Sequence, residues 1–437
     1  MNLLKPRLKK LLHIVGAASL AGILIWGSAP LAHASSELTD KGYQLEQMIV
    51  FSRHNLRTTI VKDDSSSASM MNHKLPEWNM PSGNLTMKGG INETILGQYM
   101  QAYLLDEGFM PNSWQPAYGE VDFYANSYQR TIATAQYFAV GMLPTANVPI
   151  RHTLSINDRD PVFIKPHILD TPKLYELCMK YHNDNFEAYK ADCHRCFGSF
   201  EKISDFKNSP FAKQHGISHI DTSNLYLNMQ GENKNILNYS GDARNAYKLL
   251  DAIIMNYFEE PDNNMADWGS GMTDQDWKNI GCIKTRGIEM ISANPAIALR
   301  NSHDILNIIA DDLKNDRLKF AFLCGHDTNI FNILTVLQAE DYTLPETILT
   351  KAPLGIKIVL EKRQDAAGKL FINPYLMYMS DRQQRNSSQL NLQHPPMLYP
   401  LSFKGLHKTE DGLYPYAEIE ERLNMINDQY NEYCVIK

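Results

Sequence analysis

The sequence predicts an α/β fold, a mixed sheet flanked by helices, into which a mostly α-helical domain is inserted. Short apolar runs typical of buried strands alternate with segments of helical periodicity over residues 35–159 and again over 282–437. Residues 160–281 differ, because they hold few strand-like runs and several helical ones, such as "NAYKLLDAIIMNYFEE" (Asn245–Glu260). We therefore expect an α/β domain built from two stretches of chain, with a helical cap domain between them.

The first predicted strand is "LEQMIVFS" (Leu45–Ser52), which is apolar without alternation, as in strands that are buried on both faces. It ends at two polar residues, Arg53 and His54. The polar, serine-rich stretch 62–84 is too long for a simple connection, and long ordered loops are often functional. Residues 87–108 then show the periodicity of a helix that stops at a glycine.

A second strand is predicted over Val121–Ala125. Asn126 or Ser127 is suited to cap a helix that continues to about Met142. Arg130 falls in the first turn of this helix, where its side chain can reach an anion bound at the helix N-terminus.

The later part of the chain repeats the design of the first strand. Phe320–Cys324 is another buried-strand run, and His326 and Asp327 stand at its end, before a further helix. Residues 354–362 and 371–379 read as two more strands.

The N-terminal 34 residues have the three-part order of a secretory signal peptide. A basic start precedes the apolar run 14–26, and the small-residue site "AHA" closes the segment. The alternative is a membrane anchor, but the apolar run is short for crossing a bilayer. We expect a periplasmic or secreted protein without a stable membrane anchor.

The charge balance argues against anionic macromolecules as partners. The formal net charge is −7, and removal of the leader, which has four basic and no acidic side chains, makes it more negative. Nucleic acid and anionic membrane surfaces are therefore not expected partners, and the oligomeric state stays open.

Six cysteines are present, and an exported protein meets oxidising conditions, so some of them can pair. The sequence alone cannot choose the pairing. Cys324 lies in an apolar run and is expected to be a buried free thiol. The motif "CHRC" (Cys193–Cys196) can be a zinc half-site, but a local disulfide or two ordinary cysteines are favoured, since no second ligand pair follows.

Charged and polar side chains gather where two predicted strands end. Ligands of open α/β sheets bind in the crevice at the carboxyl ends of the strands, so these side chains are expected to converge. Each has a blander alternative, such as a surface arginine, a helix cap at the aspartate or a satisfied junction histidine. The candidate residues are Arg53, His54, Arg57, Arg130, His326 and Asp327.

Their chemistry fits a phosphoryl group. Guanidinium groups present planar forks of donors that match phosphate oxygens. His54 can attack phosphorus to form a phosphohistidine, and Asp327 can protonate the departing oxygen. The arginines supply the charge stabilisation that a metal would otherwise give, so we expect no metal and no cofactor.

These motifs resemble those of the histidine acid phosphatases. "RHNLR" (Arg53–Arg57) is similar to the family signature R-H-G-x-R-x-P, "GHDTN" (Gly325–Asn329) to its H-D motif, and "NSYQRTIATAQYF" (Asn126–Phe138) to a third segment. "ADWGSGMTDQDWKN" and "APLGIKIV" resemble the bacterial periplasmic branch of glucose-1-phosphatases and phytases. The resemblance covers essentially the whole chain after the leader.

The resemblance implies a phosphoglycerate-mutase-like α/β domain with a helical domain over the site. It implies that His54 is the phosphorylated nucleophile and Asp327 the proton donor. It also implies that Arg53, Arg57, Arg130 and His326 bind the phosphoryl oxygens.

The chain departs from the family signature at two positions. Asn55 stands where the signature has glycine, and Thr59 where it has proline. "RHNLR" is similar to the glucose-1-phosphatases of the family and differs from the "RHGVR" of its phytases, which favours a sugar phosphate as the small-molecule substrate.

Three other functions remain as alternatives. A phytase, acting on inositol polyphosphates, is the nearest to the favoured phosphomonoesterase. A phosphomutase of the same superfamily is less consistent with a signal peptide. A non-catalytic binder of phosphorylated ligands has no need for Asp327.

Overall fold

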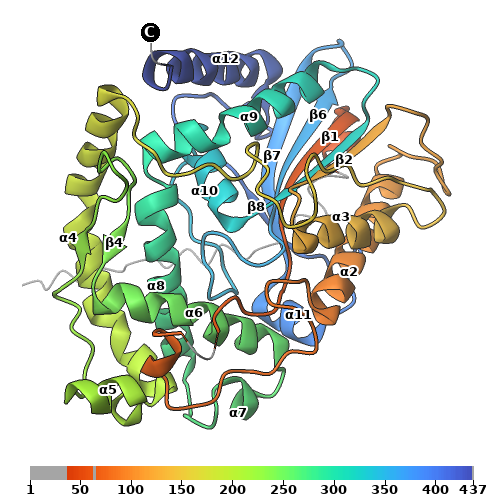
Figure 1. The fold of residues 1–437 in the computed structure, drawn as a ribbon. Coiled ribbons are helices and arrows are strands. Elements are labelled where there is room, and N and C mark those ends of the chain that lie inside the picture. The colour runs from red at the N-terminus through yellow and green to blue at the C-terminus, as the bar shows by residue number, and fades with distance from the viewer. Residues whose placement is uncertain (1–36, 63–64, 436–437) are drawn as a thin grey trace, which may run out of the picture.

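A computed structural model describes residues 37–62 and 65–435 of the chain (Figure 1). The predicted signal peptide, residues 1–34, lies outside the described residues. Within the described part, helices flank a mixed seven-stranded sheet, which confirms the predicted fold class. No helix in this part is both long enough and apolar enough to cross a membrane.

The sheet has the strand order β2-β5-β1-β6-β7-β8, and β9 also pairs with β7. Its strands β2, β5 and β1 are parallel, whereas β6 to β9 pair antiparallel. In the register of β1 and β5, Arg53 lies opposite Gly325, so the carboxyl ends of these two strands are level. The strands are β1 (Gln44–Arg53), β2 (Val121–Ala125), β5 (Phe320–Gly325), β6 (Lys357–Gln364), β7 (Leu370–Tyr378), β8 (Met397–Pro400) and β9 (Tyr414–Pro415).

Helices cover both faces of the sheet, which explains why β1 is apolar without alternation. Met48 and Val50 of β1 pack into the core beneath two helices, and Ile49 and Phe51 pack into the core on the opposite face. The first pair of helices is α2 (Met87–Asp106) and α3 (Gln129–Met142), and the opposite face is covered by α9 (Pro295–Lys314), α10 (Asp327–Val336) and α12 (Tyr416–Tyr433).

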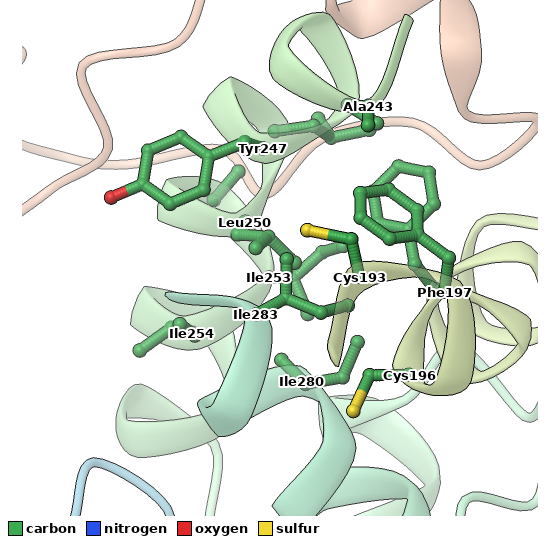
Figure 2. Close-up of a cluster of buried hydrophobic side chains, with 14 of the residues drawn as sticks. Cys193, Cys196, Phe197, Ala243, Tyr247, Leu250, Ile253, Ile254, Ile280 and Ile283 are labelled. Atoms are coloured by element: carbon green, nitrogen blue, oxygen red, sulfur yellow. The ribbon is translucent and has the colours of Figure 1, made fainter. Parts of the chain in front are cut away.

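The helical region has an apolar core of its own. Figure 2 shows part of this core, where Phe197, Leu250 and Ile283 come from three different helices. Its elements are α4 (Pro172–Ser204), α5 (Pro210–His215), α6 (Asp242–Glu259), α7 (Asn263–Ala266), α8 (Asp274–Ser292) and the small hairpin of β3 (Tyr226–Leu227) and β4 (Tyr239–Ser240).

We propose that this region is a cap domain inserted into the α/β domain. The expected boundary between residues 281 and 282 needs correction, because α8 runs through it without a break. The polar breaks in the sequence do not mark this end of the cap. We place the boundary at the end of α8, near Ser292.

The predicted helix cap at Asn126 or Ser127 was wrong. Helix α3 begins at Gln129, its N-cap residue is Tyr128, and no side chain caps it. The Asn126 side chain instead contacts His326, and the Ser127 hydroxyl accepts a hydrogen bond from the backbone N–H of Leu154. Tertiary contacts therefore use the side chains that local pattern assigned to the helix end.

The cysteines of the described chain are free thiols. Cys324 is buried in β5, as predicted. Cys193 and Cys196 of the "CHRC" motif lie on α4 and pack into the apolar core of the helical region (Figure 2). The short elements left are α11 (Asp381–Asn386) and the 3₁₀ turns at Ala68–Met70 and Phe206–Asn208.

Candidate active site

The level ends of β1 and β5 bring four predicted residues together. The backbone N–H of His54 donates to the carbonyl of Gly325 at 2.9 Å. The imidazole rings of His54 and His326 then lie with their centroids 5.4 Å apart. The guanidinium of Arg53 lies 3.2 Å from the Asp327 carboxylate. Parallel pairing thus joins the two motifs at one sheet edge.

The remaining two predicted residues, Arg57 and Arg130, reach the same place. The positive charges of both act on the buried His54 ring. Arg130 stacks over the Tyr128 ring at 4.4 Å, and the Tyr128 ring lies 5.7 Å from that of His326. All six candidate residues therefore surround one point.

The three arginines retain donors that face no acceptor. The Nε atoms of Arg53, Arg57 and Arg130 are all buried and find no hydrogen-bond partner among the described residues. A buried donor without a partner costs free energy, and a buried cluster of such donors is suited to an anion. Three planar donors around one point match the oxygens of a phosphoryl group.

Asp251 of α6 orients Arg57 and was not predicted from the sequence. Its carboxylate accepts from Arg57 Nη1 at 3.0 Å and from Nη2 at 2.5 Å. It also accepts from the Thr59 hydroxyl at 3.1 Å and from the backbone N–H of Ile60 at 3.0 Å. Because Asp251 binds Nη1 and Nη2 of Arg57, the Nε–H of this guanidinium stays available for a ligand.

One hydrogen bond fixes the tautomer of His54. Its Nδ1 lies 2.8 Å from the backbone carbonyl oxygen of Asn55. A carbonyl oxygen can only accept, so the proton sits on Nδ1 and Nε2 keeps its lone pair. The ring thus presents a nucleophilic nitrogen.

Electrostatics keep this ring neutral. Burial lowers the pKa of His54 well below its usual range, and the charges of Arg130, Arg57 and Arg53 lower it further. Burial and the neighbouring Arg57 also lower the pKa of Arg130, to about 10, which still leaves it charged. A neutral imidazole among cations remains a nucleophile at acidic pH.

His326 is held in a complementary way. The Asn126 amide nitrogen lies 2.6 Å from its Nε2. The side-chain amide of Asn126 therefore orients the imidazole ring of His326 at the end of β5. Burial, followed by the charge of Arg130, lowers the pKa of His326 well below its usual range.

Asp327 is ionised in the ligand-free site. Burial alone would raise the pKa of its carboxyl, but Arg53, Lys284, His326 and Arg57 lower it to about 2. Asp327 is the first residue of α10, and its Oδ1 accepts from the backbone N–H of Thr328 at 2.9 Å. A bound anion would offset these cations and raise the pKa of the carboxyl again.

A cavity of about 550 Å³ opens directly beside Arg57, Asp251 and Asp327. Two lysines from the helical region, Lys248 and Lys284, line it. The Lys284 ammonium lies 5.0 Å from the centroid of the Tyr247 ring, and its charge acts on Asp251 and Asp327. The cavity therefore places two lysines beside the cluster of arginines.

Sequence reasoning missed three contributors to this site. Asp251 had a visible signal, since it is a lone carboxylate within the apolar run "KLLDAIIM" of a helix. Asn126 was assigned to a helix cap, and Lys284 has no distinguishing pattern in the sequence. No group of three or more His, Cys, Asp or Glu side chains in the described ranges is arranged to hold a metal ion.

Comparisons with known proteins show the family and the fold of the chain. Residues 38–189 match the family model of the histidine phosphatase superfamily, branch 2. Glucose-1-phosphatase of Salmonella typhimurium is 30% identical over 415 residues, which cover 93% of this chain and 98% of that protein. Phytase AppA of Escherichia coli is 22% identical over 413 residues, covering 87% and 91% of the two chains.

Solved structures share the fold. The phytase of Citrobacter braakii superposes with a TM-score of 0.78 at 20% identity, covering 88% of this chain and 98% of that one. The Hafnia alvei phytase without ligand also gives 0.78, at 23% identity, covering 88% and 97%.

Fold, cationic site and relatives together define a phosphatase, a hydrolase of small phosphate esters. More narrowly, the chain belongs to branch 2 of the histidine phosphatase superfamily.

Proposed function

We propose that this phosphatase is an exported acid phosphomonoesterase that works through a phosphohistidine on His54, with glucose 1-phosphate as a preferred substrate. The observation that carries the proposal is the neutral His54 ring, with its free Nε2, among three arginines whose buried Nε donors face no acceptor. The sequence pattern of the leader supports export.

In the first step, His54 Nε2 attacks phosphorus, and the bond from phosphorus to the ester oxygen breaks. Arg53, Arg57, Arg130 and His326 hold the three non-bridging oxygens and stabilise the charge that develops there. The departing alkoxide takes a proton from Asp327 and leaves as the alcohol.

In the second step, Asp327 takes a proton from water, and the hydroxide oxygen that forms attacks the phosphorus atom of the phosphohistidine. The bond from phosphorus to Nε2 breaks, inorganic phosphate forms, and His54 returns to its starting tautomer. Asp327 thus gives one proton and regains one from water, and it passes that proton to the departing phosphate, which leaves the carboxyl ionised again.

The proton on Asp327 requires an explanation, since its carboxyl is ionised in the ligand-free site. A phosphate monoester has its second ionisation near pH ~6 and arrives below that pH as a monoanion. Charge from the bound phosphoryl group offsets the arginines, so the proton of the ester can pass to the carboxylate. Substrate binding therefore loads the acid.

Glucose 1-phosphate follows from the relatives and from the motif. Two relatives with 30% and 28% identity are glucose-1-phosphatases, and "RHNLR" departs from the signature of the family at Asn55. The loop 62–84 and the cap domain are the parts of the chain that we expect to select the leaving group.

A specific observation keeps phytase activity as the second candidate. Lys248 and Lys284 line the cavity beside the arginines. A leaving group that carries further phosphates would pair with these ammonium groups, whereas glucose offers them only hydroxyls.

A substrate panel tests the choice. We expect kcat/KM to be higher for glucose 1-phosphate than for phytate, with p-nitrophenyl phosphate also hydrolysed. The reverse order for the first two would assign the chain to the phytase activity. No hydrolysis of any of the three esters would refute the phosphomonoesterase itself.

A further inference from the structure

Asn55 has every polar atom engaged, although the signature of the family has glycine at its position. Its backbone N–H donates to the Thr134 hydroxyl at 3.2 Å. Its side-chain oxygen accepts from the backbone N–H of Leu56 at 2.7 Å and from the amide of Gln384. Its backbone carbonyl is the acceptor for the Nδ1–H of His54. The residue that orients the nucleophile is therefore itself held from three directions.

The remaining polar atom, Nδ2, ties Asn55 to a buried ion pair. Its Nδ2 donates to Glu93 Oε1 at 2.8 Å. Glu93 and Lys357 are both fully buried, and the Lys357 ammonium lies 3.0 Å from Glu93 Oε2. The same ammonium donates to the carbonyl of Gly355 at 2.9 Å. Helix α2 and strand β6 are thus fixed relative to the end of β1 through this side chain.

Gly355 is shaped by the same contact. Its φ of +67° is a conformation that favours glycine. A Cβ at this position would lie 2.5 Å from Asn55 Nδ2 and 2.8 Å from Glu93 Oε1. Any larger residue at 355 must therefore displace the hydrogen bond between Asn55 and Glu93.

We propose that Asn55 is a positioning residue, whose side chain, anchored on the pair of Glu93 and Lys357 and on Gln384, fixes the carbonyl that orients His54 for attack. The inference rests on the proposed role of His54 as nucleophile. A glycine at position 55 would keep the carbonyl but lose all the side-chain contacts that hold it. In this chain, hydrogen bonds of the Asn55 side chain therefore fix the position of the carbonyl, which a glycine at this position could not do.

The expected effect is on the chemical step and not on phosphate binding. Misplacing a reacting group by about 1 Å can cost ~10²-fold in rate. We expect Asn55→Ala and Asn55→Gly to lower the rate of phosphoenzyme formation in single-turnover experiments by about 10- to 100-fold. The inhibition constant of inorganic phosphate, which the arginines bind, should stay within about twofold.

A spectroscopic measurement reports on the orientation directly. In protein labelled with ¹⁵N-histidine, the wild-type His54 ring should show a protonated Nδ1 and an unprotonated Nε2. In the Asn55 variants the ring should populate both tautomers. Gly355→Ala, which leaves residue 55 unchanged, should reproduce the loss of rate.

Asn294→Ala is the matched control. Asn294 is buried and donates to the backbone carbonyl of Cys178 at 3.2 Å, and it makes no hydrogen bond to Asn55, Gln384 or His54. This variant should lose stability while keeping the wild-type rate. His54→Ala is the reference for the proposed function, since turnover that survives in it would refute the nucleophile and not the role of Asn55.

The proposal is overturned if Asn55→Gly or Gly355→Ala folds and forms the phosphoenzyme at the wild-type rate. It is also overturned if the inhibition constant of phosphate rises in parallel with the loss of rate, because Asn55 would then organise the anion site. An equal loss of rate in Asn294→Ala would reduce the role of Asn55 to general stability.

Discussion

In the proposed mechanism His54 attacks phosphorus and Asp327 protonates the leaving oxygen, so their variants should differ in sensitivity to the leaving group. A sugar alkoxide needs a proton to depart, whereas p-nitrophenolate is a far better leaving group. General acid catalysis contributes ~10²–10⁴-fold. We expect Asp327→Asn to lower kcat/KM for glucose 1-phosphate by about that factor and for p-nitrophenyl phosphate much less. Equal losses on the two esters would mean that Asp327 is not the proton donor and that it acts as a helix cap or organises the phosphate site.

The pH dependence follows from the same two residues. The productive complex needs a neutral His54 and one proton shared between Asp327 and the ester. The pKa of Asp327 is about 2, and the second ionisation of the ester lies near pH ~6. Between these two values, the form with one proton on the pair is the most populated. The depressed pKa of His54 keeps the ring neutral over much of this range.

We therefore expect kcat/KM for glucose 1-phosphate to be highest at acidic pH and to fall about tenfold per pH unit well above pH ~6. A series of initial rates from acidic to neutral pH, in buffers of constant ionic strength, measures this. A rate that rises through neutrality would contradict the acid role of Asp327.

At the scale of elements, α6 of the cap supports the site through a single buried ion pair. Asp251→Asn removes the charge that compensates Arg57. Breaking one partner of a buried pair costs about 3–5 kcal/mol. We expect the free energy of unfolding in urea to fall by about that amount and the KM for phosphate esters to rise, because Arg57 loses its orientation.

Asp262→Asn supplies the control for that experiment. Asp262 is an exposed residue that caps the short helix α7, and asparagine caps helices equally well. Its free energy of unfolding should change by less than about 0.5 kcal/mol. An unchanged KM in Asp251→Asn would mean that Arg57 needs no anchor from the cap.

Elements that the sequence predicted well are those with a local signal. The strand ends at Arg53 and at Gly325 follow from short apolar runs, and the pairing of β1 with β5 then brings His54 and His326 together. The contact between Arg57 and Asp251 joins residues 194 positions apart and crosses from one region to the other. No periodicity or spacing encodes such a pair.

Asn126 and Asn55 illustrate a different limit. Local pattern made Asn126 a helix cap, but its partner, His326, is 200 positions away. Asn55 was read as a departure from a motif, and its meaning depends on Glu93 and Gln384, which come from two other helices. Side-chain roles of this kind are decided by tertiary packing and not by neighbours in sequence.

At the scale of the whole molecule, the proposed mechanism takes its charge stabilisation from three arginines, and Asp251 of the helical region holds one of them, Arg57. The described ranges contain no arrangement of three or more metal-ligating side chains. We expect the purified enzyme to retain full activity after prolonged treatment with EDTA. Loss of turnover that zinc or magnesium restores would overturn the arginine-based mechanism.

The most direct test of the account is to trap the covalent intermediate. Wild type, His54→Ala and Asp327→Asn would each be mixed with p-nitrophenyl phosphate labelled in its phosphoryl group, quenched rapidly in alkali and analysed by peptide mass spectrometry. The p-nitrophenolate leaving group needs little protonation, so the first step stays fast in Asp327→Asn. We predict an acid-labile, alkali-stable phosphate on His54 in wild type, more of it in Asp327→Asn, where water is not activated, and none in His54→Ala. A phosphoryl group on another residue, or turnover of the ester by His54→Ala, would contradict the assignment of His54 as the nucleophile.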